Sequence, residues 1–418
     1  MHKAIAPVIR LGLLLSLAAA LTGCGKKNAP TAGTELEVAG PGPRPAAGAP
    51  APRPTPPAGP LTDAECQAFA ANWEKAVNLR SVEVVGSLID GDALLASALA
   101  GLELPAPVRA RVGEAAQARF AAQIIEPILA GATYKFLRLH AKADRKYALC
   151  RLLTADGRVN YHDVLLARGP GGRVRAADIY VLFAGELLSQ TYRRVVVQLL
   201  GQGGAGEANR LKGPDRDLLH SLATLERISA ARQKGDLKEA RRLFAELPEG
   251  MRGEKAFLLL RVQLTPREDE AEYLAALEAF RSRYPEDAGV DLLSIDFFAL
   301  KKDYAKALEA IGRVEKAVGG DPSLLVQRAN VHVLRGANAE ARQAARQALE
   351  QEPTLLGAYW ALVAVSLKEK AFKETLEHLK AIDQKFAVQF ADLTAVPEYA
   401  EFVKSPQYQE WLAYPKRR

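Results

Sequence analysis

Apolar and polar positions follow two different periods in the first part of this chain. Between residues 61 and 130, apolar side chains recur three and four positions apart, as at Phe69, Trp73 and Val77, which predicts amphipathic helices. Thr62 and Glu65 have the spacing of a capping box and predict where the first helix begins. The first segment with a regular pattern is therefore helical.

The period shortens to two after Gly131, which predicts strands. The candidate strands are residues 134–141, 147–153, 159–167 and 174–183. Asp156-Gly157 is a hairpin signal between the second and third. Helices followed by an antiparallel meander indicate an α+β domain over residues 61–200. Alternation along the first strand places Tyr134, Arg138 and His140 on one face.

The helical period returns from residue 218 and then repeats. Ala307, Ala341 and Thr375 are small residues spaced 34 positions apart, each preceded by a bend. Pro322 and Pro353 follow the first two units. A unit of this kind has an apolar face that only a stacked neighbour can bury. The pattern therefore predicts stacked helix–turn–helix units.

This 34-residue period, with small residues at the helix crossing and proline at the exit, resembles the tetratricopeptide repeat (TPR). Ala240 and Ala276 mark two earlier units whose spacing departs from 34. The resemblance implies an all-α TPR solenoid over residues 218–385. Residues 386–418 break the period, and we expect them to form a helical cap over the last apolar face.

The α+β domain resembles the NTF2-like fold, a small cone. The likeness rests on the order of elements, on the first helix with Trp73, and on the closing run Asp178-Ile179-Tyr180. The expected fold class is thus a multidomain chain: a small α+β, NTF2-like domain followed by a TPR solenoid. The glycine-rich residues 201–217 are expected to connect the two, since they lack the spacing of a phosphate-binding loop.

The N-terminal region has the features of an export signal. Lys3 and Arg10 precede an apolar run, residues 11–21, which is too short to span a bilayer. Residues 1–23 are therefore expected to be a signal peptide. Leu21-Thr22-Gly23-Cys24 resembles the lipobox of bacterial lipoproteins, which implies lipid on Cys24 and anchorage to a membrane. The alternatives are an ordinary signal peptide with an incidental cysteine, or a membrane-spanning helix.

Residues 24–60 are rich in Pro, Ala and Gly and have few large apolar side chains. They cannot form a core, so we expect a disordered tether. By the lipoprotein resemblance, Gly25 after the cysteine favours the outer membrane over the inner one. The expected location is therefore the bacterial cell envelope.

Composition narrows the classes of partner. The 418 residues carry a net charge of +7, but basic and acidic residues are interleaved and aromatics are 7% of the chain, which argues against nucleic acid. The three cysteines are too far apart in sequence to form a metal-ligand pair, and no metal or cofactor is expected. After lipidation, Cys66 and Cys150 remain, either joined as a disulfide or buried separately.

The TPR resemblance also implies a partner groove along the inner face of each first helix. Its positions here are Leu292, Asp296, Val326, Asn330, Trp360 and Ala364. The family's clamp for a C-terminal carboxylate needs Lys, Arg and Asn, and only Asn330 fits. We therefore expect an apolar peptide or helix of a partner protein in this groove. Alternatively, these positions pack on neighbouring helices or are unused.

The function that follows is a membrane-anchored scaffold or assembly factor, without enzymatic activity. The chain shows no catalytic signature, and no catalytic residue is assigned. The alternative is an enzyme or small-molecule binder that uses a pocket in the cone, with the repeats as a docking arm. In that case the candidate polar groups are His140, His162, Asp178 and Tyr180.

Overall fold

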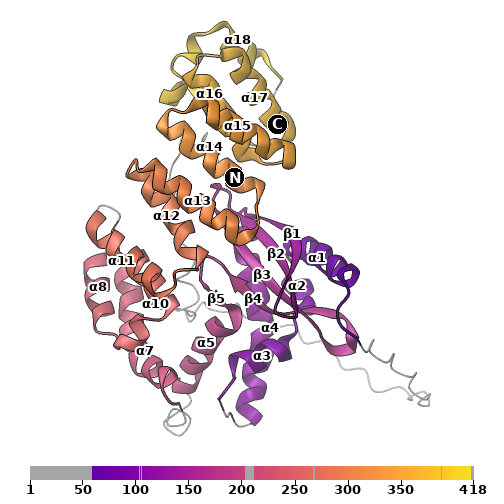
Figure 1. The fold of residues 1–418 in the computed structure, drawn as a ribbon, viewed down its shortest axis with the longest axis vertical. Coiled ribbons are helices and arrows are strands. Elements are labelled where there is room, and N and C mark those ends of the chain that lie inside the picture. Colours follow the sequence, from indigo (N-terminus) through magenta and orange to yellow (C-terminus); the bar gives the residue numbers. More distant parts are fainter. Residues whose placement is uncertain are drawn as a thin grey trace, which may run out of the picture.

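The structure, a computed structural model, describes residues 59–102, 104, 106–202, 211–266, 269–386 and 388–415. A sheet with its own helices forms one part, and a long row of helices forms the other (Figure 1). The predicted signal peptide, Cys24 and nearly all of the tether lie outside the described residues.

In the described part of the chain, four helices precede the sheet. They are α1 (Asp63–Asn78), α2 (Val82–Leu88), α3 (Gly91–Ala98) and α4 (Ala106–Leu129). The predicted start at Thr62 is confirmed: its hydroxyl accepts from the backbone N–H of Glu65, and the Glu65 carboxylate accepts from the backbone N–H of Thr62 at 2.8 Å. These two bonds satisfy donors that a helix start leaves unpaired.

The described strands form one antiparallel sheet in chain order. They are β1 (Thr133–Lys142), β2 (Arg145–Leu153), β3 (Val159–Arg168), β4 (Val174–Val181) and the short β5 (Glu186–Leu187). Gly157 has a φ of 83° in the turn between β2 and β3, a conformation that glycine adopts without strain. The predicted meander is therefore confirmed.

One detail of the predicted sheet is wrong. The pairing of β1 with β2 shifts between Phe136 and Arg138, which is a β-bulge. Tyr134 packs in the core beneath the helices, whereas Arg138 reaches the opposite side of the sheet. The bulge adds one residue to the alternation, so Tyr134 does not share a face with Arg138 and His140.

A second group of helices follows the sheet. It comprises α5 (Leu188–Gln202), α7 (Pro214–Gln233), α8 (Leu237–Ala245), α9 (Glu249–Arg252), α10 (Lys255–Leu264) and α11 (Glu270–Arg283). Helix α7 begins within the predicted connector, whose residues 203–210 are not described. Arg193 of α5 forms a two-bonded ion pair with Asp215 of α7, so the two helices are fixed to each other.

Three helix pairs in strict 34-residue register come next. Their helices are α12 (Ala288–Leu300), α13 (Tyr304–Val318), α14 (Pro322–Arg335), α15 (Asn338–Gln351), α16 (Leu356–Lys368) and α17 (Phe372–Lys385). Each helix contacts the next in the chain. Ala307, Ala341 and Thr375 are 0% exposed, because they lie where two helices cross. The close approach of the helices there leaves room only for a small side chain.

The bends inside these pairs repeat as well. Lys302, Gly336 and Lys370 have φ values of 61°, 78° and 56°, and they too are 34 positions apart. In each pair, a residue in the left-handed region therefore turns the chain from the first helix into the second. Two of these three positions are lysine, which adopts this conformation at a cost in energy.

Short helical turns near the C-terminus cover the last pair. They are η2 (Leu393–Ala395), η3 (Pro397–Tyr399), η4 (Phe402–Lys404) and α18 (Pro406–Ala413). Tyr399, Phe402 and Trp411 pack with Leu379 of α17 in one apolar cluster. This cluster shields the apolar end of the row from water, as the cap expected there would.

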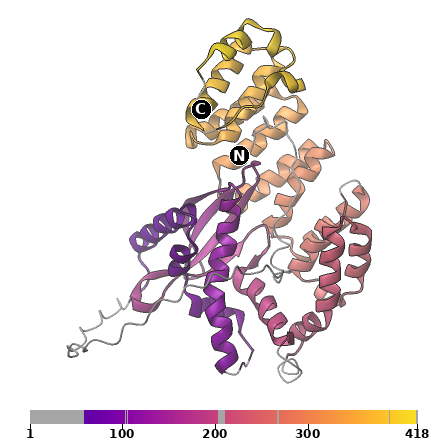
Figure 2. The same ribbon diagram turned by 180° about the vertical axis from the view of Figure 1, so that it is seen from behind.

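The sheet has apolar contacts on both faces. One face packs on α1–α4, and this core continues through α5 into α7, α8 and α10. The other face packs against α12, α13 and α14, as the view from behind also indicates (Figure 2). The two parts of the chain are therefore joined by continuous apolar packing.

Candidate functional site where the sheet meets the helix pairs

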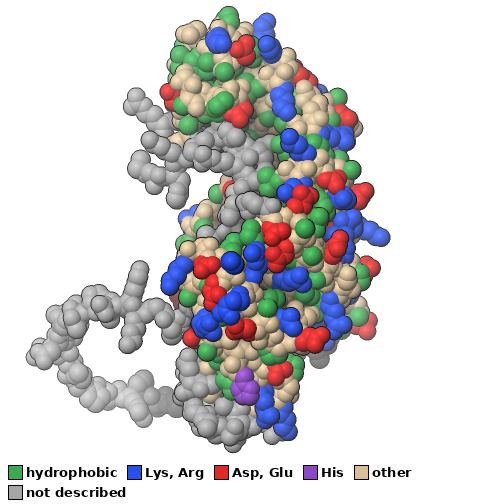
Figure 3. All heavy atoms as spheres, turned by 90° about the vertical axis from the view of Figure 1, so that its left-hand side faces the viewer, with side chains coloured by type: hydrophobic (Ala, Val, Ile, Leu, Met, Phe, Trp, Pro, Cys, Tyr) green, Lys and Arg blue, Asp and Glu red, His purple; other side chains and the backbone are tan. Residues whose placement is uncertain are grey.

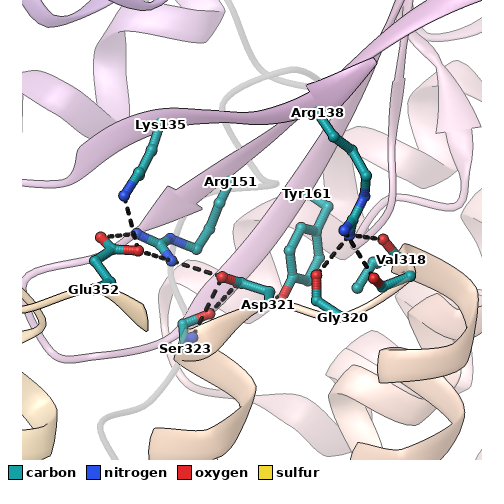
Figure 4. A network of polar contacts seen from close by, with 10 residues as sticks. Lys135, Arg138, Arg151, Tyr161, Val318, Gly320, Asp321, Ser323 and Glu352 are labelled. Carbon is teal, nitrogen blue, oxygen red and sulfur yellow. Dashed lines mark hydrogen bonds and ion pairs between the residues drawn. The ribbon is translucent and has the colours of Figure 1, made fainter. Parts of the chain in front are cut away.

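The face of the sheet that looks towards the helix pairs combines apolar and charged contacts. Leu149 on β2 and Val159 and Tyr161 on β3 share an apolar cluster with Ile295 of α12 and Leu324 of α14. Burying such side chains stabilises by roughly 1.5–3 kcal/mol each. The charged contacts lie at the edge of this cluster and are drawn in Figure 4.

A buried arginine lies at the centre of the charged contacts. The NH1 group of Arg151 is 2.7 Å from a carboxylate oxygen of Asp321, and its NH2 group is 2.7 Å from one of Glu352. The Arg151 side chain is only 3% exposed. Lys135 on β1 adds a second cation, 3.0 Å from Glu352. Two cations and two carboxylates thus balance in charge, with Arg151, Asp321 and Glu352 buried and Lys135 at the exposed edge.

The pKa values reflect this arrangement. Burial acts to raise the pKa of Glu352, but hydrogen bonds and charge from Arg151, with those from Lys135, outweigh it and leave the pKa below its usual range. Burial acts to lower the pKa of Arg151, and Glu352 and Asp321 together reverse this. Arg151 and Glu352 therefore keep each other ionised inside the protein.

Local chain geometry places the two carboxylates. Asp321 is the N-cap of α14, with Pro322 in the first turn, and it accepts a bond from the backbone N–H of Ser323 at 3.3 Å. Glu352 precedes Pro353 at the end of α15. Proline disfavours helix for the residue before it, so both carboxylates stand in loops, free to face the sheet.

A tyrosine contact recurs in the repeat register. Tyr161 on β3 donates to Asp321 at 2.8 Å, and Tyr180 on β4 donates to Asp287 at 2.8 Å. Asp287 and Asp321 are 34 positions apart, and both are N-caps of first helices. The next position in register, Leu355, forms no side-chain cap. Burial raises the pKa of both tyrosines, so the hydroxyls stay protonated and act as donors.

Arg138 contacts the end of α13. Its guanidinium donates to the carbonyl oxygens of Gly319 and Gly320, at 2.7 and 2.6 Å, and to that of Val318. The last carbonyls of a helix lack partners within it and carry partial negative charge, so a cation is stabilising there. The sheet thus touches both the end of α13 and the start of α14.

A cleft of about 600 Å³ opens beside this contact. Leu137 and Arg138 of β1 form one wall, and Glu315, Leu325 and Glu350 of the helix pairs line the rest together with neighbouring polar residues. The lining carries both apolar and charged groups. It contains neither His140 nor Asp178, the residues that the enzyme hypothesis would place in a pocket.

The six predicted groove positions have different surroundings in the structure. Leu292 packs against the apolar cluster of the sheet face, and Val326 is buried with residues of α16. Trp360 meets Phe390 of the C-terminal cap, with ring centroids 5.9 Å apart. The other three positions are half-buried on their first helices: Asp296, Asn330 and Ala364. The chain itself therefore covers part of the predicted groove.

The polar residues of the enzyme hypothesis do not converge. His140 pairs with Asp163 at 2.7 Å, while Asp178 accepts from the hydroxyl and the backbone N–H of Ser189. His162 lies in the core, with its Nδ1 atom 3.2 Å from the hydroxyl of Tyr134, and burial lowers its pKa to about 4. Tyr180 is the donor to Asp287 described above.

The two remaining cysteines are buried free thiols. Cys66 on α1 and Cys150 on β2 both belong to the core beneath the sheet, and they are not joined. Burial raises the pKa of both thiols, which keeps them protonated and unreactive. Within the described ranges there is no group of three or more residues that could hold a metal ion.

In the same part of the chain, no helix combines the length and apolar character needed to cross a bilayer. Comparisons with protein-family models, with curated proteins and with solved structures give no match. The residues at the sheet contact were not predicted as a site. Their only signal in the sequence is a charged Arg151 within the apolar run of β2, and a carboxylate directly before Pro322 and Pro353.

Proposed function

We propose that this chain is a lipid-anchored scaffold of the bacterial cell envelope that holds another protein through its helical repeats. In this proposal residues 1–23 direct export, Cys24 carries lipid, and residues 24–60 are the tether. An NTF2-like domain over residues 61–200 and a connector at 201–217 lead to TPR repeats over 218–385 and a cap over 386–418.

The repeat register carries the proposal. The crossing residues Ala307, Ala341 and Thr375 are fully buried at 34-residue intervals, and the bends at 302, 336 and 370 keep the same interval. Helix pairs that stack in this way form an extended surface, and TPR arrays use such surfaces to bind other chains. The meander with helices on one face is the corresponding support for an NTF2-like domain.

The tether and anchor rest on the sequence. About 36 residues of extended, proline-rich chain reach roughly 100 Å, which lifts folded domains clear of a bilayer. An acyl chain contributes about 0.8 kcal/mol per buried methylene, so two or three chains hold a protein firmly. By the lipoprotein resemblance, Gly25 after the cysteine supports the outer membrane over the inner one.

The open groove positions suggest the partner. Since Leu292 and Val326 are covered within the chain, a partner would meet the half-buried positions Asp296, Asn330 and Ala364. Only Asn330 matches the carboxylate clamp, so we expect an apolar peptide or helix rather than a charged tail. Basic and acidic side chains are mixed over the face shown in Figure 3, which does not favour nucleic acid as the partner.

The proposal assigns no catalytic role to the sheet domain. His140, His162 and Asp178 each have a different partner, and none lines the cleft beside β1. A general acid or base needs access to a substrate as well as a suitable pKa. This separation supports a binding protein over an enzyme.

Two measurements on the protein in its native membrane test the proposal. Labelled palmitate should enter the full chain and be absent from the Cys24→Ser variant, which should also leave the membrane fraction. A photo-crosslinking residue at Ala364 should capture one defined protein, whereas the same residue at Gln343, exposed on α15, should not. Absence of lipid, or identical capture from both positions, contradicts the proposal.

A further inference from the structure

Arg151 contacts two loops that belong to consecutive helix pairs. Asp321 lies in the loop between α13 and α14, and Glu352 lies in the loop between α15 and α16. The guanidinium is planar and rigid. Its NH1 group donates to Asp321 at 2.7 Å and to Glu352 at 3.1 Å, and its NH2 group donates to Glu352 at 2.7 Å. The separation between the two loops is therefore set by the width of one side chain.

A row of repeats does not fix this separation by itself. Each unit contacts only its neighbours, so small rotations between units add up along the row. The loop at Asp321 leads into α14 and the loop at Glu352 leads from α15 towards α16, so both lie at the same end of the pair α14–α15. A rigid bridge between them restrains the rotation of this pair against α16–α17.

We propose that Arg151 is a positioning residue that sets the spacing of these two loops and holds the row of repeats at one curvature. The sheet is the rigid support for this clasp, which consists of Arg151, Asp321 and Glu352. The sheet domain thus acts on the shape of the repeats, in addition to packing beside them.

Neighbouring strands hold the same loops. Arg151 lies on β2, which is paired on one side with β1 and on the other with β3. From β1, Lys135 contacts Glu352, and from β3, Tyr161 contacts Asp321. The hydrogen bonds between the strands fix the distance between these three side chains, so the sheet transmits one spacing to both loops.

The clasp has a consequence for partner binding, and this part of the inference rests on the proposed function. A groove along α12, α14 and α16 has a width that depends on the angle between successive pairs. With the clasp closed, the groove is pre-formed, which removes the cost of ordering it when a partner binds.

The clasp can be tested without any partner. Spin labels are attached to cysteines introduced at Glu309 on α13 and Glu377 on α17, which are exposed and two repeat intervals apart. Pulsed electron paramagnetic resonance on the full chain in detergent then gives the distance distribution between them. Cys66 and Cys150 are buried, and a sample without the introduced cysteines measures background labelling.

We expect a narrow distribution in the parent protein and about a doubling of its width in Arg151→Met, because the pairs then rotate independently. Arg145→Met, an exposed arginine on the same strand, should leave the distribution unchanged. Arg151→Lys should also broaden it, since an ammonium group is a point charge that cannot hold two carboxylates in a fixed fork.

A parent-like distribution in both Arg151→Met and Arg151→Lys would overturn the inference. If Arg151→Met does not fold, Glu352→Gln takes its place, because it weakens one arm and leaves the bond to Asp321. Broadening in Glu352→Gln supports the clasp, and an unchanged distribution rejects it. Neither outcome depends on whether the protein carries lipid or binds a partner.

Discussion

The hydroxyl of Tyr161 on β3 donates a hydrogen bond of 2.8 Å to Asp321, the N-cap of α14, across 160 residues of sequence. The carboxylate has a second partner in the sheet, Arg151. Asp321 thus starts a helix and at the same time joins that helix to the sheet. The same double use occurs at Asp287, which caps α12 and accepts from Tyr180.

Tyr161→Phe should destabilise the protein by about 1.5–3 kcal/mol, the range for a hydrogen bond to a charged group. The ring stays in its apolar cluster, while a buried carboxylate loses one donor. Chemical denaturation of the two proteins at neutral pH measures the difference.

Tyr147→Phe is the matched control. Tyr147 lies on β2 and stacks on His140, and its hydroxyl has no hydrogen bond among the described residues. We expect it to change the free energy of unfolding by less than about 0.5 kcal/mol. Equal losses from both substitutions would show that the bond to Asp321 contributes nothing of its own.

His162 should make stability depend on pH. Burial lowers its pKa in the folded protein from 6.5 to about 4, so between these values the unfolded chain binds a proton that the folded protein does not. Stability is then complete above about pH 6.5 and falls as pH decreases towards 4, by about 3 kcal/mol for a shift of this size. His332 and His378, whose pKa values are also lowered, act in the same direction.

Unfolding free energies measured between pH 4 and pH 7 check this. His162→Gln should reduce the slope of the unfolding free energy against pH, since it removes a group whose pKa is lowered by folding. His220→Gln, at an exposed position on α7, should retain the parental slope. A slope that is unchanged in His162→Gln would mean that other groups control the acid response.

Ala307→Leu should be strongly destabilising. Ala307 is 0% exposed at the crossing of α12 and α13, and added methylene groups in a packed core cost about 1–3 kcal/mol or more. Ala305→Leu, at an exposed position on the same helix, has the same chemistry without the crowding. Thermal unfolding should separate the two variants, and similar midpoints would argue that the crossing is loosely packed.

The left-handed bends give opposite predictions for two substitutions. Lys302→Gly should stabilise by about 1 kcal/mol, because glycine adopts a positive φ without the steric cost that lysine has there. Gly336→Lys, at the equivalent position one repeat later, should destabilise by a similar amount. Lys301→Gly, where φ is −77°, should bring no gain. Denaturation curves of the three proteins provide the comparison.

Local signals predicted the elements well. The capping box at Thr62, the turn at Gly157 and the burial of Ala307 and Ala341 each depend on residues close together in sequence. Such features follow from spacing and backbone preference alone. The predicted face of Tyr134 failed because a bulge changes the parity of a strand, and no residue type in β1 marks it.

The contact between the sheet and the repeats could not be predicted from the sequence. Arg151 is 170 residues from Asp321 and 201 from Glu352, and periodicity carries no information about pairs so distant. The repeat pattern indicated an open groove, while the fold places the sheet face against part of it. Tertiary packing decided which of the six groove positions remain accessible.

The apolar core that joins Trp73, Val196 and Leu225 has a consequence for how such a chain can evolve. Modules that merely touch can be exchanged by recombination, because each keeps its own interior. Here the interior is shared across α1, α5 and α7, so a new N-terminal half would arrive with side chains that do not interlock with the old C-terminal half. A substitution that changes the volume of this interior in one half is therefore compensated most directly by a substitution in the other half.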